Sequence, residues 1–358
     1  MSRHILHDWR PEDPAFWAAS GHRIARRNLW ISIPNLLLAF SIWMLWSTAA
    51  TRLNTVGFKF STAELFWLTA LPALSGATLR IFYSFMVPIF GGRLWTTLST
   101  LSLAIPAIGI GVAVQNPETP YGVFVVLALF CGLGGAAFAS SMANIGFFFP
   151  KAQKGNALAL NAGFGNLGVS VLQFTAPLIT GVALFSPLLG APQTFVEDGV
   201  QHQVWLQNAG FVWVPFILIA AAAAWFGMND VASARASFRE QAVVFQRKHN
   251  WLICFLYIGT FGSFIGFSAA FPLLGKTLFP DVNILQIAFL GPLVGAASRA
   301  LTGWVSDRWG GHNVTQIVFY ALILGVLAVL QSVGAFGAEP SFSLFFPSFL
   351  WLFFWTGV

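Results

Sequence analysis

The stretch Gly76-Ala77-Thr78-Leu79-Arg80 leads through small residues to an arginine, and Gly295-Ala296-Ala297-Ser298-Arg299 repeats this pattern 219 residues later. A pair of glycines follows each arginine at the same distance, Gly91-Gly92 and Gly310-Gly311. Small residues recur in most membrane helices, but here a charged residue recurs with them. The repeat predicts two similar halves related by an axis along the membrane normal. The two arginines would then face each other across a central cavity.

Both arginines lie in long apolar segments. Of the 358 residues, 57% are hydrophobic and 8% are charged, whereas about 25% are charged in an ordinary soluble domain. A helical membrane span needs about 20 mostly apolar residues. The composition therefore predicts an all-α integral membrane protein embedded in a lipid bilayer. Ten spans are predicted, at residues 30–50, 64–89, 94–114, 121–147, 157–185, 207–227, 251–275, 284–305, 314–335 and 341–358.

The longest charged segment between spans, residues 228–250, divides the chain. We interpret it as a cytoplasmic loop between a six-span first half, 29–227, and an incomplete second half, 251–358. Residues 1–28 are polar and are predicted to form a cytoplasmic N-terminal segment. Because the tenth span runs to the last residue, we expect the chain to be truncated at its C-terminus.

The distribution of basic residues predicts the orientation of the chain. With a cytoplasmic N-terminus, thirteen of the 18 Lys and Arg residues fall in inside segments, and three, Arg52, Lys59 and Lys276, fall in outside loops. This asymmetry follows the positive-inside rule for the inner membrane of a cell. The net charge of +6 is spread over loops, so it does not indicate nucleic-acid binding.

The remaining two arginines, Arg80 and Arg299, lie deep within apolar stretches, and no acid or histidine in those stretches could balance them. An arginine near the bilayer centre costs about 2.5–3.5 kcal/mol on insertion scales, so intramembrane charge usually marks a functional site. The pair predicts a site for an anion. We find neither a carboxylate relay within the spans nor a catalytic cluster, so an enzyme, a cofactor and a metal are not predicted.

A glycine pattern occurs in the fifth predicted span, where Gly163, Gly165 and Gly168 fit the form G-x-G-x-x-G. A dinucleotide site would need a preceding strand and an acid about 20 residues later, and neither is present. In a membrane helix this spacing indicates close approach of a neighbouring helix. Asn161 and Asn166 would then present amides where backbones nearly touch, and Asn166 could donate to a ligand in the cavity.

The segment after the eighth span, Gly303 to Gly311, resembles the loop signature of the major facilitator superfamily. That family implies a bundle of twelve helices in two pseudo-symmetric halves, of which about ten are present here. We expect Asp307 and Arg308 to form a gating cluster in this loop. The corresponding first-half stretch, Val87 to Arg93, keeps the glycines but lacks the acid.

Four stretches closely resemble nitrate/nitrite antiporters of the NarK type: Asp8 to Trp17, Arg80 to Pro88, Ala139 to Asn144, and Asn161 to Gly168. The resemblance covers nearly the whole chain. It implies nitrate and nitrite as the transported anions, exchange of the two by alternating access, and a monomer. It also implies the residues that bind the anion: Arg80, Arg299, Asn166, Tyr257 and Phe138.

Other functions are compatible with parts of this pattern. A proton-coupled nitrate symporter would commonly need a carboxylate or histidine relay in the membrane. An organic-phosphate exchanger could also use two arginines, but its substrate is bulkier than a phenylalanine-rich site would accept. An anion channel and a membrane-embedded enzyme belong to other classes. We favour exchange and keep symport as the alternative.

Overall fold

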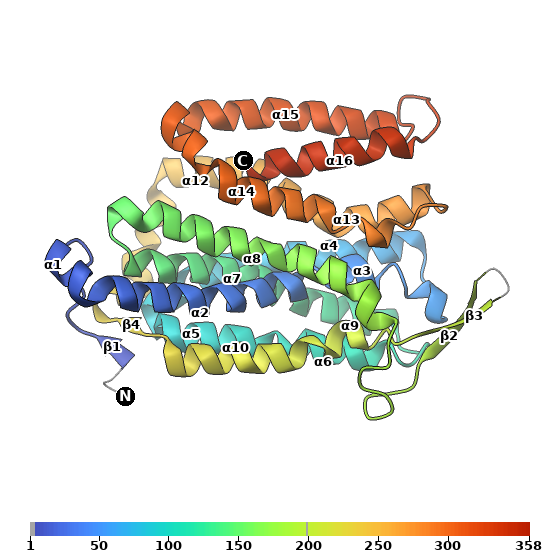
Figure 1. Ribbon diagram of the computed structural model, residues 1–358, viewed down its shortest axis with the longest axis horizontal. Helices are drawn as coiled ribbons and strands as arrows, with labels where there is room; N and C mark the ends of the chain where they lie inside the picture. The colour runs from blue at the N-terminus through green and yellow to red at the C-terminus, as the bar shows by residue number, and fades with distance from the viewer. Residues whose placement is uncertain (1–3, 198–199) are drawn as a thin grey trace.

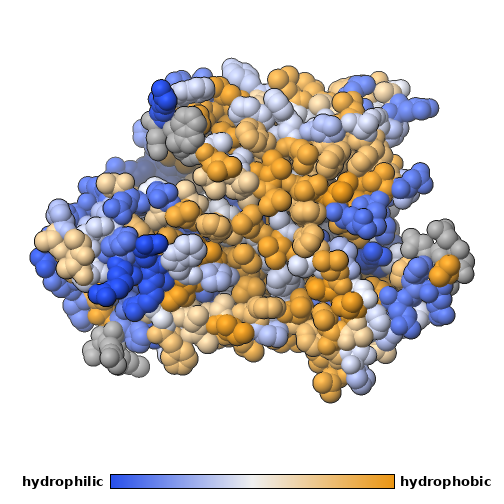
Figure 2. All heavy atoms as spheres, viewed as in Figure 1, coloured by the Kyte–Doolittle hydropathy of each residue, from blue (hydrophilic) through white to orange (hydrophobic). Residues whose placement is uncertain are grey.

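A computed structural model describes residues 4–197 and 200–358, apart from the side chains of residues 196, 197, 303, 304 and 307. The long helices run roughly side by side, with the N-terminal strand at one end of the bundle and a β-hairpin at the other (Figure 1). On the visible face, apolar side chains form a broad band between two more polar ends (Figure 2). A bundle that spans a bilayer needs this distribution.

The first part of the chain supplies α1 to α10. The bounds are β1 Ile5–Leu6, α1 Pro14–Phe16, α2 His22–Trp43, α3 Trp46–Ala49, α4 Thr62–Phe90, α5 Gly92–Ser102, α6 Ala104–Ala113, α7 Tyr121–Phe148, α8 Lys151–Thr180, β2 Gln193–Glu197, β3 Val200–Val204, α9 Asn208–Phe211 and α10 Trp213–Gly227. A π-helical turn, Trp17–Gly21, connects α1 to α2, and a 3-10 turn, Asn54–Val56, precedes α4.

The second part supplies α11 to α16. The bounds are β4 Asp230–Val231, α11 Phe238–Gln241, α12 Lys248–Tyr257, α13 Ser263–Leu278, α14 Leu290–Trp309, α15 Gly311–Ser332 and α16 Phe342–Gly357. A π-helical turn, Ile258–Gly262, joins α12 to α13. Short 3-10 turns occur at Ala232–Ala234, Ala242–Gln246 and Ile284–Gln286.

Within the described residues, nine helical segments are long and apolar enough to cross a membrane, and α16 is a shorter apolar helix. These segments correspond to the predicted spans, although two begin earlier than hydropathy suggests. The first begins at Pro14, because Asp13 accepts hydrogen bonds from the N–H groups of Ala15 and Phe16 and proline is favoured at the first helical position. The fifth begins at Lys151, where the charged residues of its first turn lower the local hydropathy below that of a membrane span.

Two small sheets, which the sequence analysis did not predict, lie outside the membrane helices. Strand β1 pairs in parallel with β4, Ile5 with Asp230 and Leu6 with Val231. Strands β2 and β3 form an antiparallel hairpin between α8 and α9. These strands are short, so they leave little periodic signal in the sequence.

The glycines of α8 lie where this helix packs against α2. A Cβ atom at Gly165 would come 2.6 Å from a methyl group of Leu36, and one at Gly168 would come 3.0 Å from the Cβ atom of Phe40. The hydroxyl of Ser41 donates to the carbonyl oxygen of Gly168 at 2.9 Å. The absence of side chains at both glycines therefore allows the two backbones to approach closely.

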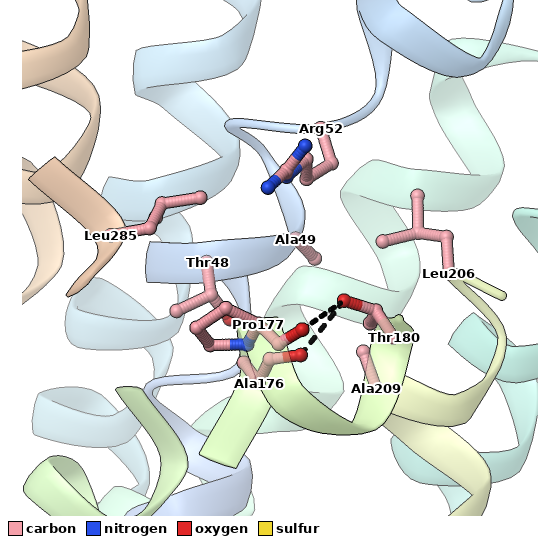
Figure 3. A pocket seen from close by; sticks show the side chains of 9 residues that line it. All are labelled: Thr48, Ala49, Arg52, Ala176, Pro177, Thr180, Leu206, Ala209 and Leu285. Carbon is pink, nitrogen blue, oxygen red and sulfur yellow. Dashed lines mark hydrogen bonds between the residues drawn. The ribbon is translucent and has the colours of Figure 1, made fainter. Parts of the chain in front are cut away.

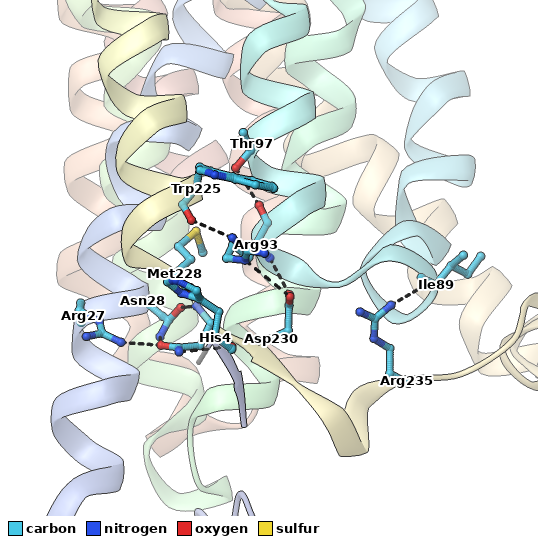
Figure 4. Close-up of polar contacts among 11 residues, drawn as sticks. His4, Arg27, Asn28, Ile89, Arg93, Thr97, Trp225, Met228, Asp230 and Arg235 are labelled. Carbon is cyan, nitrogen blue, oxygen red and sulfur yellow. Dashed lines mark hydrogen bonds and ion pairs between the residues drawn. The ribbon is translucent and has the colours of Figure 1, made fainter. Parts of the chain in front are cut away.

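An ion pair joins the beginning of α5 to β4, which follows α10 (Figure 4). One carboxylate oxygen of Asp230 accepts from the backbone N–H of Arg93 at 2.9 Å, and the other lies 3.9 Å from the guanidinium of Arg93. Arg93 also donates to the carbonyl of Trp225 at 3.0 Å. Asp230 therefore places a carboxylate beside the turn Gly91-Gly92, where the first-half loop itself has no acid.

The segment that follows α10 is attached to the first half by further hydrogen bonds (Figure 4). The amide of Asn28 and the guanidinium of Arg27 both donate to the side-chain oxygen of Asn229, at 3.2 Å and 2.6 Å. Arg235 donates to the carbonyl of Ile89 at 2.6 Å, near the end of α4. These contacts tie the segment between the halves to α2 and α4.

Replacing Gly168 with alanine should destabilise the protein by about 1–3 kcal/mol, because the new methyl group overpacks the contact between α8 and α2. The melting temperature of the purified protein in detergent measures this change. Gly155→Ala is the matched control, since Gly155 lies in the same helix and nothing lies within 4 Å of the added atom. Equal melting temperatures for the two variants would contradict the close contact.

Candidate anion-binding site

Arg80 projects from α4 towards α7, where a single backbone oxygen holds one edge of its guanidinium. Nε and Nη2 donate to the carbonyl oxygen of Gly135 at 3.2 Å and 2.9 Å. The arginine is half-buried. A guanidinium carries five N–H donors, so the remaining donors can face another group.

Aromatic rings surround the same guanidinium. Its central carbon lies 5.4 Å from the ring centroid of Trp43 and 5.1 Å from those of Phe138 and Phe261. The rings of Phe138 and Phe261 stack, with centroids 5.4 Å apart and planes inclined by 23°. Rings at these distances attract a cation through their quadrupoles, which offsets part of the cost of holding the charge in an apolar surrounding.

Arg299 reaches the same aromatic group from the other half of the chain. Its guanidinium carbon lies 5.3 Å from the centroid of Phe261, and the residue is half-buried. Tyr257 stacks on Phe261 with centroids 5.0 Å apart, and its phenol interacts with both Arg80 and Arg299. The structure thus brings together four of the predicted residues, Arg80, Arg299, Tyr257 and Phe138.

No carboxylate balances these two charges in the part of the chain that the structure describes. The ion pairs found there join Arg10 to Asp8 and Asp13, and Arg93 to Asp230. Two permanently charged guanidinium groups contact one aromatic ring, and no acid neutralises them there. Such a site strongly prefers an anion. A small planar anion suits it best, because the guanidinium donors are coplanar.

The two asparagines of α8 differ in their surroundings. Asn161 donates through its amide nitrogen to the hydroxyl of Ser141 at 2.9 Å. Asn166 is 1% exposed. The side-chain oxygens of both asparagines have no hydrogen-bond partner among the described residues. Buried amides are rarely left unpartnered. No described contact joins Asn166 to either arginine, although Gly163 on the same helix faces Ala300, the neighbour of Arg299.

The predicted gating loop is shorter than expected. Asp307 and Arg308 were expected in a loop, but both belong to the last turn of α14. The helix continues to Trp309, and the chain turns only at Gly310, where φ is +83° and glycine is favoured. The side chain of Asp307 lies outside the described residues, and Arg308 is exposed.

Two groups of the site were not predicted: the ring of Trp43 and the carbonyl of Gly135. Phe261 follows Tyr257 by four positions, which places both on one face of a helix, and the sequence marks this pair as a candidate for lining the cavity. Trp43 comes from a distant helix without any pattern that marks it. A backbone carbonyl carries no sequence signal at all.

The halves are in contact at the end of the bundle near Thr51. Lys276 donates to the carbonyl of Thr51 at 2.6 Å, and Gln173 donates to the carbonyl of Ser268 at 2.9 Å. A nearby pocket, which is lined by Thr48, Arg52 and Leu285 among others (Figure 3), has a volume of about 10 Å³. That volume barely admits one water molecule. This pocket is therefore closed to an ion the size of nitrate in this conformation.

Known proteins resemble this chain over nearly its whole length. Residues 31–358 match the Major Facilitator Superfamily. The nitrate/nitrite transporter NarU of Escherichia coli (strain K12) is 54% identical over 360 residues, which cover 100% of this chain and 76% of that protein. The "Probable nitrate/nitrite antiporter NarK2" of Thermus thermophilus is 48% identical over 358 residues, 98% of this chain and 79% of that protein.

Among solved structures, the chain resembles the xylose transporter XylE from E. coli in a partially occluded inward open conformation. The TM-score is 0.64 with 14% sequence identity, over 93% of this chain and 84% of that chain. At this identity the likeness shows the fold alone.

Replacing Asn166 with alanine should weaken the binding of nitrate, because it removes the side-chain NH2 group that the family resemblance implies as a donor to the anion. A lost hydrogen bond to an ion costs about 1.5–3 kcal/mol, or roughly ten- to a hundredfold in affinity. Titration calorimetry on the purified protein measures it, with Asn313→Ala in an exposed position as the control. Unchanged affinity would limit Asn166 to a packing role.

Proposed function

The chain belongs to the nitrate/nitrite transporter family of the major facilitator superfamily, and we propose that it exchanges nitrate for nitrite across the inner membrane of a cell by alternating access. It is a secondary transporter rather than an enzyme. The observation that carries the proposal is the approach of Arg80 and Arg299 to one ring, Phe261, without a neutralising acid among the described residues.

In this proposal the two arginines hold the anion between the halves. Arg80 and Arg299 would each offer coplanar N–H donors to its oxygens, with Tyr257 and Asn166 as further donors. The ring of Phe138 would form one wall of the pocket. At an effective dielectric of about 20, a charge pair about 4 Å apart gains about 4 kcal/mol, which helps to offset the removal of water from the ion.

The charges also favour exchange over one-way transport. With the cavity empty, Arg80 and Arg299 repel each other and oppose the closing of the halves around the site. A bound anion screens this repulsion and lets the two halves change their orientation. The binding site would therefore change its orientation mainly when an anion is bound, which couples the entry of one anion to the exit of another.

Alternating access requires two bodies that move relative to each other. We assign residues 29–227 to one and 251–358 to the other, with 228–250 as the connection and the N-terminus in the cytoplasm. The positive-inside distribution of Lys and Arg supports this orientation. A monomer suffices, because both arginines come from one chain. Asp307 and Arg308, at the end of α14, would contribute to the cytoplasmic gate.

Proteoliposomes that contain the protein should take up external nitrate when they are loaded with nitrite and should take up little when they are empty. Uptake of labelled nitrate, with and without internal nitrite, measures this counterflow. Uptake that a pH gradient alone drives would contradict exchange and would indicate proton symport. Single-channel currents in a planar bilayer would point to a channel.

The variant Arg80→Lys should lower nitrate exchange at least about tenfold, because lysine keeps the charge but loses the planar fork of donors. The exchange rate in nitrite-loaded proteoliposomes measures this loss. The control is Arg10→Lys, since Arg10 lies in an exposed ion pair near the N-terminus. Near-normal exchange by Arg80→Lys would show that charge alone, without geometry, holds the anion.

A further inference from the structure

The two arginines of the sequence repeat are held in different ways. Arg80 donates twice to the Gly135 carbonyl and lies against three aromatic rings. Arg299 has no hydrogen bond to a backbone carbonyl among the described residues, and its described contacts are with Phe261 and Tyr257. One guanidinium is therefore fixed on several sides, whereas the other retains freedom to turn.

Trp43 is one of the three aromatic residues that contact the Arg80 guanidinium. It does not belong to the stack that Phe138, Phe261 and Tyr257 form. Its indole N–H donates to the carbonyl of Pro72 in α4 at 2.7 Å, and the residue is 3% exposed. Pro72 lies two turns before Arg80 on the same helix. The hydrogen bond therefore fixes the indole to the helix that carries the arginine.

A notch made by glycines receives this indole. A Cβ atom at Gly76 of α4 would come 2.9 Å from Nε1 of Trp43, and one at Gly135 of α7 would come 2.6 Å from Cζ2. A Cβ atom added at Gly134 would likewise come 3.2 Å from the Cβ atom of Trp43. Gly135 thus has two roles, since its missing side chain admits the indole while its carbonyl binds Arg80.

A neighbouring tryptophan shows that burial alone does not produce this arrangement. Trp46 is fully buried and packs edge-on against Phe124, with centroids 5.7 Å apart. Its indole nitrogen has no hydrogen-bond partner among the described residues, and no described contact joins it to an arginine. Trp46 fills space in the core, whereas Trp43 has its N–H satisfied and a cation near its ring.

We propose that Trp43 is a positioning residue that holds the Arg80 guanidinium against the Gly135 carbonyl, so that Arg80 is a preformed wall of the anion site and Arg299 is the arm that turns onto the anion. The Gly135 carbonyl occupies the Nε and Nη2 edge, which leaves the Nη1 side for the anion. A preformed donor binds more tightly because it loses less freedom on binding. This inference rests on the proposed function.

Kinetics of nitrate exchange in proteoliposomes test the inference. Trp43→Met, which fills the space without an aromatic face, should raise the KM for nitrate about tenfold and leave the maximal rate within about twofold. Trp43→Phe, which restores a ring, should recover part of this loss. Trp46→Met is the matched control and should leave the KM unchanged.

An unchanged KM in folded Trp43→Met would overturn the inference, as would an equal rise in Trp46→Met, because the effect would then be general to the core. If Trp43→Met does not fold, Trp43→Phe against Trp46→Phe decides in the same way, since only the former loses the bond to Pro72. Melting curves of each variant separate loss of fold from loss of affinity.

A structure of the anion-free Trp43→Met protein tests positioning independently of transport. We expect the Arg80 guanidinium to leave the Gly135 carbonyl while Arg299 keeps its place beside Phe261. An undisturbed Arg80 would refute the role of Trp43 even if exchange is impaired. Failure of the wild-type protein to exchange nitrate would refute the proposed function instead and would leave this structural outcome to decide the inference.

Discussion

The central constraint on this protein is the presence of two guanidinium groups on one aromatic ring within a bundle of apolar helices. Arg80 and Arg299 come from different halves of the chain and meet at Phe261. Charge in such surroundings is costly unless something balances it. Aromatic faces and a backbone carbonyl supply part of the balance, and an anion can supply the rest. The substrate is thereby a component of the site's electrostatics.

Glycine packing is the means by which the helices reach this arrangement. Gly165 and Gly168 let α8 approach α2, and Gly76 and Gly135 admit the indole of Trp43. Larger residues at these positions would push the helices apart and move the arginine relative to its partners. The many glycines of the spans therefore contribute to the geometry of the site as well as to the packing of the bundle.

Contacts outside the apolar spans supply groups that the local sequence of a loop lacks. The first-half loop lacks the acid of its second-half counterpart, and Asp230 of β4 places a carboxylate at that turn. The strand pair between β1 and β4 and the bonds of Asn229 hold the N-terminus and the connecting segment on the same surface. The segment that follows α10 is thus anchored to the helices that precede it.

The sequence by itself determined the membrane class, the apolar spans, the family and the pair of arginines, because hydropathy, charge and a repeated motif are local properties of the chain. Helix ends such as Pro14 required capping contacts that hydropathy does not report. Only the tertiary structure decided that Trp43 and the Gly135 carbonyl contact Arg80, while Arg299 has no such carbonyl partner among the described residues. Contacts between distant helices depend on how backbones pack, and a carbonyl group is the same at every position of a sequence.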